Sequence, residues 1–288
     1  MRFGEREVVV LAAAETHGVD DRHAGATQSL GSVLDAFLSS WSDEDDHDVR
    51  RIIAARAHGP AAAAGPEGDE RRAWMCVDWL VRTYAPAWLA FAGVDQSAAA
   101  LRLHDELTDT RSLDAALRTI GAVRAQVDSA LEAVIGDHAD AASEGACAAA
   151  YEIVRAECAT GCDAVVDAAA AAGRGDPGRI TCSSCLEAVW GAVALAALRL
   201  PLGACRTSAV ELARVVACTE PDTTAAQHCA RYADVREVVL TRLQPEFAFE
   251  CRPVVVSLRE SMRSLFSKLA LVGADPDDSG GVDRWVRA

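Results

Sequence analysis

The segment that decides the fold is DERRAWMCVDWLVRTYAPAWLAFAG, residues 69–93. Large apolar side chains recur along it at steps of three and four, which places them on one continuous face of a helix. These side chains are Trp74, Val77, Val81, Tyr84, Trp88 and Phe91. An adjacent face is also apolar, so the segment predicts a helix at the centre of a hydrophobic core. Pro86 should kink or restart this helix, and Gly93 should end it, since glycine suits the left-handed residue after a helix.

The remainder of the chain is rich in alanine and poor in aromatic residues. Hydrophobic residues make up 51% of the 288 residues, but aromatic residues only 5%. Alanine has the highest helix propensity of all residues, so runs such as VVDAAAAAG favour helix over strand. We therefore predict an all-α protein, a multi-helix bundle or array of about ten helices with no substantial sheet.

Three regions are expected along the chain. Residues 1–136 should form an N-terminal helical region built on the Trp-rich helix at 67–93, and residues 137–272 an Ala- and Cys-rich helical bundle. Residues 273–288 read as a flexible tail. One continuous helical array agrees with the pattern equally well. Further helices are expected near 95–106, 112–135, 138–172, 183–199, 207–218, 222–243 and 253–272.

Local signals suggest where some of these helices begin and end. Ser112 and Ser184 are typical first residues of helices, and Ser184 is followed by a glutamate at capping-box spacing. The segment GRGDPGRI, residues 173–180, predicts a loop. Pro245 and Pro253 are expected to separate helices, because proline cannot donate the helical hydrogen bond.

The formal net charge of −15 limits the partners that the chain could bind. Nucleic acid and anionic membranes both need clustered Lys and Arg, so neither is expected. A basic protein partner would suit the charge. The first residues do not resemble a secretory signal, and the longest apolar run, Ala188–Leu198, is shorter than the roughly 20 residues that span a bilayer. The prediction is a cytoplasmic protein with reduced cysteines.

Two segments carry a resemblance to other proteins. AWMCVDWLVRTYAPAWLAFAGV, residues 73–94, and LQPEFAFECRPVVVSLRESMRSLFSKL, residues 243–269, resemble uncharacterised Ala/Trp-rich all-helical proteins of GC-rich bacteria. The chain has a single lysine, Lys268, and no asparagine, which fits a GC-rich genome. Some proteins of this look carry toxin-immunity labels. The resemblance implies a helical fold and an immunity-like role, and it assigns no catalytic residue.

The cysteines offer the first candidate site. Nine of the ten cysteines fall between Cys147 and Cys251. Four of them, at helical or CxxC spacing, could hold Zn²⁺ tetrahedrally as thiolates. They are Cys158, Cys162, Cys182 and Cys185. Two other interpretations stay open: a redox pair at the start of a helix, where thiol pKa values fall, or small side chains that pack in an Ala-rich core. The sequence favours packing.

Carboxylates and a histidine give two further patterns. Asp105 with Asp109, and Asp163 with Asp167, have DxxxD spacing, which on helices could bind Mg²⁺ and a diphosphate as in all-α isoprenoid synthases. The alternative is that these are solvated helix faces in an acidic protein. Glu44–His47 has the ExxH spacing of di-iron bundles but lies in an acidic stretch that reads as an exposed helix start.

We therefore expect a non-enzymatic helical protein–protein interaction protein, a scaffold or an immunity-like protein, without a cofactor. Its partner would be a protein, with a basic surface as the best match to the charge. The first alternative is a Cys-based metal-binding or thiol redox protein, in which zinc would be the metal. The second is a Mg²⁺-dependent, diphosphate-metabolising helical enzyme.

Overall fold

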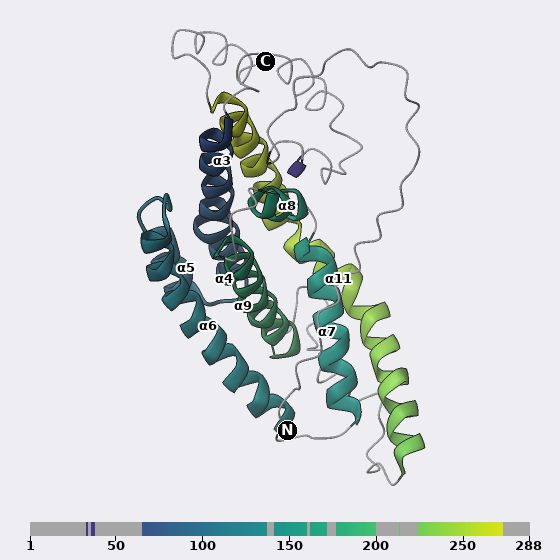
Figure 1. The fold of residues 1–288 in the computed structure, drawn as a ribbon. Coiled ribbons are helices and arrows are strands. Elements are labelled where there is room, and N and C mark those ends of the chain that lie inside the picture. Colours follow the sequence, from purple (N-terminus) through teal and green to yellow (C-terminus); the bar gives the residue numbers. More distant parts are fainter. Residues whose placement is uncertain are drawn as a thin grey trace, which may run out of the picture.

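The structure, a computed structural model, describes the larger part of the chain, and most of the described residues are helical (Figure 1). The described residues are 65–136, 141–159, 162–171, 177–199 and 224–272, together with Val33, Ala36, Phe37 and Ala213. These residues contain no β-strand, which confirms the all-α prediction. They do not confirm the expected count of about ten helices. The expected tail at 273–288 and the Glu44–His47 pair lie outside them.

The Trp-rich segment forms the continuous helix that its sequence predicts, with one irregular turn. Helix α3 (Gly65–Trp79) runs into a π-helical turn, η2 (Leu80–Tyr84), and then into α4 (Ala85–Phe91). Most of its large apolar side chains are buried in the core. The segment is therefore a central core helix, as expected.

The π-helical turn is explained by the proline that follows it. An α-helix would need an N–H at residue 86 to reach the carbonyl of Arg82, but proline has no N–H and its ring clashes with that carbonyl. Pro86 instead lies in the first turn of α4, where a missing N–H costs nothing. The N–H of Ala85 bonds to the carbonyl of Leu80, five residues back. The restart at Pro86 is thus achieved without a break in the helix.

Gly93 ends this helix as expected. Its φ of 77° lies in the left-handed region. The N–H of Gly93 donates to the carbonyl of Ala90 at 3.0 Å, and the N–H of Val94 donates to that of Leu89 at 2.8 Å. These two bonds form a Schellman motif, which satisfies carbonyls that the helix end leaves free.

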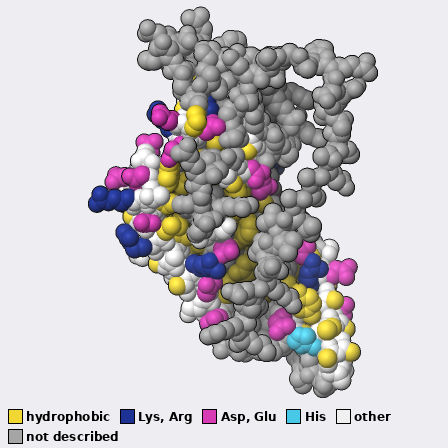
Figure 2. All heavy atoms as spheres, in the orientation of Figure 1, with side chains coloured by type: hydrophobic (Ala, Val, Ile, Leu, Met, Phe, Trp, Pro, Cys, Tyr) yellow, Lys and Arg dark blue, Asp and Glu magenta, His cyan; other side chains and the backbone are white. Residues whose placement is uncertain are grey.

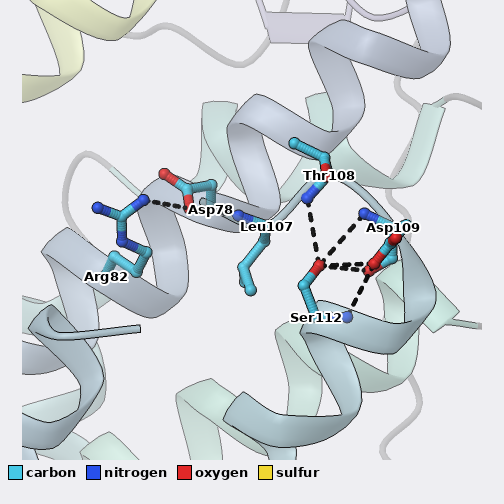
Figure 3. A network of polar contacts seen from close by, with 6 residues as sticks. All are labelled: Asp78, Arg82, Leu107, Thr108, Asp109 and Ser112. Atoms are coloured by element: carbon cyan, nitrogen blue, oxygen red, sulfur yellow. Dashed lines mark hydrogen bonds and ion pairs between the residues drawn. The ribbon is translucent and has the colours of Figure 1, made fainter. Parts of the chain in front are cut away.

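Helices α5 (Asp95–Arg102) and α6 (Thr110–Gly136) follow, and α6 starts two residues earlier than its sequence suggests. The cap is Asp109, whose carboxylate accepts the Ser112 N–H at 2.8 Å (Figure 3). The Ser112 hydroxyl also donates to this carboxylate. Ser112 is therefore the third residue of α6, and it supports the cap rather than forming it.

A second carboxylate fixes the loop between α5 and α6. Asp78, on α3, accepts the backbone N–H of Leu107 at 2.9 Å and the guanidinium of Arg82 at 3.1 Å (Figure 3). Leu107 itself is buried. The loop is thereby attached to the core helix by one polar and one apolar anchor.

The Ala- and Cys-rich part of the chain forms α7 (Ala141–Ala159), α8 (Asp163–Ala171) and α9 (Pro177–Arg199). The single helix expected at 138–172 is therefore divided in two. Residues 177–180 belong to α9 and not to a loop, and Ser184 lies inside this helix rather than at its start. Both expectations were wrong because Pro177, a favoured first residue of a helix, begins α9 instead.

The last described helix, α11 (Ala225–Leu271), has 47 residues and includes both Pro245 and Pro253. The expected break between two helices is therefore wrong. Buried apolar residues recur every three, four or seven positions from Val235 to Leu269, and they hold the chain in register across both prolines. Both prolines face solvent, where water can satisfy the carbonyls that they leave free.

The helices pack around one hydrophobic core (Figure 1). Helix α9 contacts α6 and α4 as well as α7, and α7 lies along α11. Helix α3 packs on α8 and on α11. Helices before residue 136 thus contact helices after residue 141, and the core residues form one cluster. The division into two regions stays a prediction.

A fully buried arginine joins the two ends of the described fold. The guanidinium of Arg72, on α3, donates to the carbonyls of Leu269 at 3.0 Å and Val272 at 3.1 Å. It also pairs with Asp69 at 2.9 Å. Carbonyls in the last turn of a helix lack helical partners and carry partial negative charge. Arg72 therefore caps the carboxyl end of α11.

Replacing Arg72 should destabilise the protein strongly. Arg72→Met keeps much of the side-chain volume but removes the guanidinium donor from the partly buried Asp69 and from the carbonyls of Leu269 and Val272. We expect the free energy of unfolding in urea to fall by about 3 kcal/mol or more. The neighbouring Arg71 is exposed, so Arg71→Met should change it by less than about 0.5 kcal/mol. Equal effects of the two variants would contradict the capping role.

Helices α7 and α11 approach each other closely at Gly145. A Cβ atom there would lie 2.7 Å from the backbone oxygen of Tyr232 and 3.3 Å from the backbone nitrogen of Arg236. Because backbone atoms cannot move aside as a side chain can, any larger residue would push the two helices apart. Gly145 therefore sets the spacing of this helix pair.

Two glycine-to-alanine variants test this spacing. Gly145→Ala should lower the free energy of unfolding by about 1–3 kcal/mol, since the added methyl group overpacks the helix interface. Gly121, inside α6, is the matched control because a Cβ atom there meets nothing within 4 Å. Gly121→Ala should stabilise the protein by about 0.5–1 kcal/mol through helix propensity. Stabilisation by both variants in thermal or urea unfolding would disprove the close approach.

Candidate functional site

The candidate site is a buried group of one hydroxyl and three thiols beneath the π-helical turn, which we call the thiol cluster. It consists of Tyr84, Cys158, Cys162 and Cys251. Tyr84 is the last residue of η2, Cys158 lies in the last turn of α7, Cys162 immediately precedes α8, and Cys251 lies midway along α11. All four are buried. The cluster therefore gathers side chains from four separate elements.

The hydroxyl of Tyr84 serves as a structural donor. It donates to the carbonyl of Cys158 at 2.8 Å. This carbonyl lies at the end of α7, where no helical N–H is available to it. Burial raises the pKa of Tyr84 well above its usual value of 10.0, and the nearby Cys162 and Cys158 raise it further. The hydroxyl thus keeps its proton and its hydrogen bond.

Two cysteines of the cluster, Cys158 and Cys251, are held as neutral thiols because their pKa values are raised. Burial is the largest cause in each case: it raises the pKa of Cys158 well above 9.0 and that of Cys251 to about 12. The Cys251 thiol lies 3.6 Å from the carbonyl of Ala248 as a donor. The thiolate is the form that attacks electrophiles and binds metals. A metal in this cluster would have to displace protons that the surroundings hold firmly.

The structure brings together only part of the predicted zinc set. Cys158 and Cys162 are close enough to interact, whereas the Cys185 thiol lies on α9 and approaches the carbonyl of Leu80 at 3.6 Å. Cys182 also lies on α9, but its side chain is outside the described part. Within that part no group of three or more His, Cys, Asp or Glu side chains is placed to hold a metal ion. The four-cysteine site stays a prediction.

The redox interpretation of the CxxC pair relied on a position at the start of a helix. Helix α9 begins at Pro177, so Cys185 is in its third turn and is buried. The field of the helix end acts only within its first turn. Cys185 therefore does not receive the thiolate stabilisation that this interpretation requires.

The carboxylate pairs differ in their surroundings. Asp105 and Asp109 lie in the α5–α6 loop, and Asp109 is used as a helix cap, so this pair does not share a helix face as expected. Hydrogen bonds from Ser112 lower the pKa of Asp109. Asp163 and Asp167 do lie on α8 and are exposed. Partial burial and the neighbouring Asp167 raise the pKa of Asp163.

Sequence reasoning missed two members of the cluster. Tyr84 was counted only as one of the apolar residues of the core helix, and its position just before the Ala-Pro step was the available signal. Cys251 stands alone in sequence, far from the other cysteines, and only the continuous α11 places it beside Cys158.

Comparisons with protein-family models, curated proteins and solved structures found no match to this chain. Of the helices that the structure describes, none has the length and apolar character needed to span a membrane.

The raised thiol pKa values predict a loss of stability in alkali. Burial raises the pKa of Cys147 to about 11, against 9.0 for an ordinary cysteine. The unfolded chain therefore loses this proton at lower pH than the folded one. The stabilising contribution is complete below about pH 9 and declines as the pH rises through 11, by about 2–3 kcal/mol in total.

This loss can be measured by urea unfolding at several pH values under reducing conditions. The stability difference between the original protein and Cys147→Ala should shrink as the pH rises from 9 to 11. Cys229→Ala is the control, because Cys229 is exposed and its replacement should give a difference that does not change with pH. A constant difference for Cys147→Ala would show that this thiol does not titrate as a buried group.

Proposed function

We propose that the protein is a non-enzymatic helical protein–protein interaction protein, with a scaffold or immunity-like role. The observation that supports this is a line of apolar side chains that α11 leaves in solvent. Phe249 is 73% exposed and Val256 47% exposed, and Pro253 between them also faces solvent. Steps of four and three residues place them on one face of the helix. We call these three residues the α11 stripe.

The α11 stripe lies on a helix that already buries another face in the core. A helix of a free-standing protein is expected to have one apolar and one polar face. Exposed apolar side chains gathered on one face mark interaction surfaces more often than single exposed residues do. The stripe also borders a shallow groove on α11 that continues to Glu260. These features support a binding surface for another helix.

The polar groups of the thiol cluster support a structural rather than a chemical role. Tyr84 caps a helix, and the thiols of Cys158 and Cys251 are neutral and buried. Neither arrangement offers a nucleophile or a base to a substrate.

The charge of the chain bears on the choice of partner. The net charge of −15 would favour association with a basic protein. On the face shown in Figure 2, acidic and basic side chains of the described helices are interspersed rather than gathered in one patch. Apolar contact at the α11 stripe would therefore supply most of the binding free energy, and charge would add to the rate of association.

Native mass spectrometry of the gently purified full chain, reduced and without chelator, tests this proposal. We expect an assembly heavier than one chain, which Phe249→Glu combined with Val256→Glu reduces to the single chain. Leu103→Glu is the matched control, because Leu103 is 84% exposed but lies outside α11, so it should leave the assembly intact.

A single chain at micromolar concentration, alone and after incubation in extract from its native cells, would overturn the proposal. An added mass equal to one zinc ion would instead favour the Cys-based alternative and direct attention to Cys158 and Cys162.

A further inference from the structure

We propose that the α11 stripe binds a second copy of this chain, with the two α11 helices antiparallel and related by a two-fold axis at Val256. The inference rests on the proposed function and names the partner of the same surface. It follows from the order of the exposed side chains on either side of Val256. In such an antiparallel pair, positions at equal distances before and after Val256 lie opposite each other. A residue four positions before Val256 in one copy, for example, faces the residue four positions after Val256 in the other copy.

The first pair of positions carries opposite charges. Arg252 lies four residues before Val256, and Glu260 lies four residues after it. Both side chains are exposed and lie on the side of α11 that carries the stripe. Each is about 6 Å from the axis along the helix, at 1.5 Å per residue. Antiparallel pairing places Arg252 of each copy opposite Glu260 of the other, so the two-fold axis generates two ion pairs.

The next positions are also compatible. Phe249 lies seven residues before Val256, and Arg263 lies seven residues after it; both are exposed. In the antiparallel pair the ring of Phe249 would meet the arginine stem and guanidinium of the other copy, which is a favourable contact. At the axis Val256 would meet its own symmetry mate. The face is therefore complementary to itself over about four helical turns.

A parallel arrangement has no such complementarity. It would place Arg252 opposite Arg252, and Glu260 opposite Glu260, so that like charges meet at both levels. Like charges brought together in an interface weaken binding. The antiparallel arrangement is therefore the one that the sequence of this face selects.

Local charge distinguishes a second copy from a basic partner. Two chains that each carry −15 repel one another, but residues 249–263 contain three arginines and two glutamates, a local charge of +1. At the stripe itself a second copy therefore meets little charge repulsion. A basic protein would gain nothing from charge at the stripe. It would bind more favourably to an acidic part of the surface.

Charge reversal tests the arrangement directly. In sedimentation velocity at low salt, the original protein should form dimers. Arg252→Glu and Glu260→Arg should each weaken the dimer at least tenfold, because each variant places like charges opposite one another twice. An equimolar mixture of the two variants should form a heterodimer with restored affinity, and so should the double variant with itself.

Circular dichroism of each variant provides the folding control, since both side chains are exposed and no loss of helix is expected. Arg242→Glu, an exposed charge on α11 that precedes the stripe, should leave the dimer unchanged. Added salt should weaken the original dimer and reduce the difference between variants, since it screens exposed charge pairs.

The outcomes separate this inference from the proposed function. A dimer that survives both single variants, or a mixture that does not recover, would overturn the antiparallel arrangement. A protein that stays a single chain, yet binds a different protein in a manner abolished by Phe249→Glu, would overturn the inference and leave the proposed function intact. A single chain that binds nothing would overturn both.

Discussion

The guanidinium of Arg72 is the contact on which the described fold depends most. It is buried without access to water, and it bonds to Asp69 on its own helix and to the carbonyls of Leu269 and Val272 at the end of α11. A buried charge is tolerated only when such partners are held in place, so the partners and the charge require each other. This requirement fixes where α11 ends against the helix that forms the centre of the core. The loop carboxylate Asp78 and the cap at Asp109 then position α5 and α6 around the same helix.

The sequence predicted those features that depend on neighbouring residues. The core helix at 67–93 and its end at Gly93 follow from apolar periodicity and from the conformational freedom of glycine. Features that depend on distant residues were not predictable in this way. Proline is a local signal for a helix break. At Pro245 and Pro253 the helix nevertheless continues, because buried apolar residues on the other face of α11 hold it against the core. Distant contacts also decide the pattern of α9. Its apolar residues point in all directions because other helices pack around it.

The candidate site shows the same limit more sharply. Cysteine spacing suggested a metal or redox centre. Spacing does not indicate whether a thiol is exposed to solvent, and burial is what keeps Cys158 and Cys251 protonated. Arg72 appeared in the sequence only as a polar residue on an apolar helix. The α11 stripe could not be recognised at all from sequence, since Phe249 and Val256 look like core residues until the other face of the helix is known to be the buried one.

The long sequence separation between Arg72 and its backbone partners has a consequence for co-translational folding. Its backbone partners lie 197 and 200 residues later in the chain. During synthesis the Trp-rich helix therefore leaves the ribosome long before the two carbonyls that its buried arginine caps. The amino-terminal helices cannot reach their final packing step by step as they emerge. Contacts at such separation also close slowly. Nascent chains of this protein would thus present the apolar faces of the Trp-rich helix, without their final partners, for most of their synthesis.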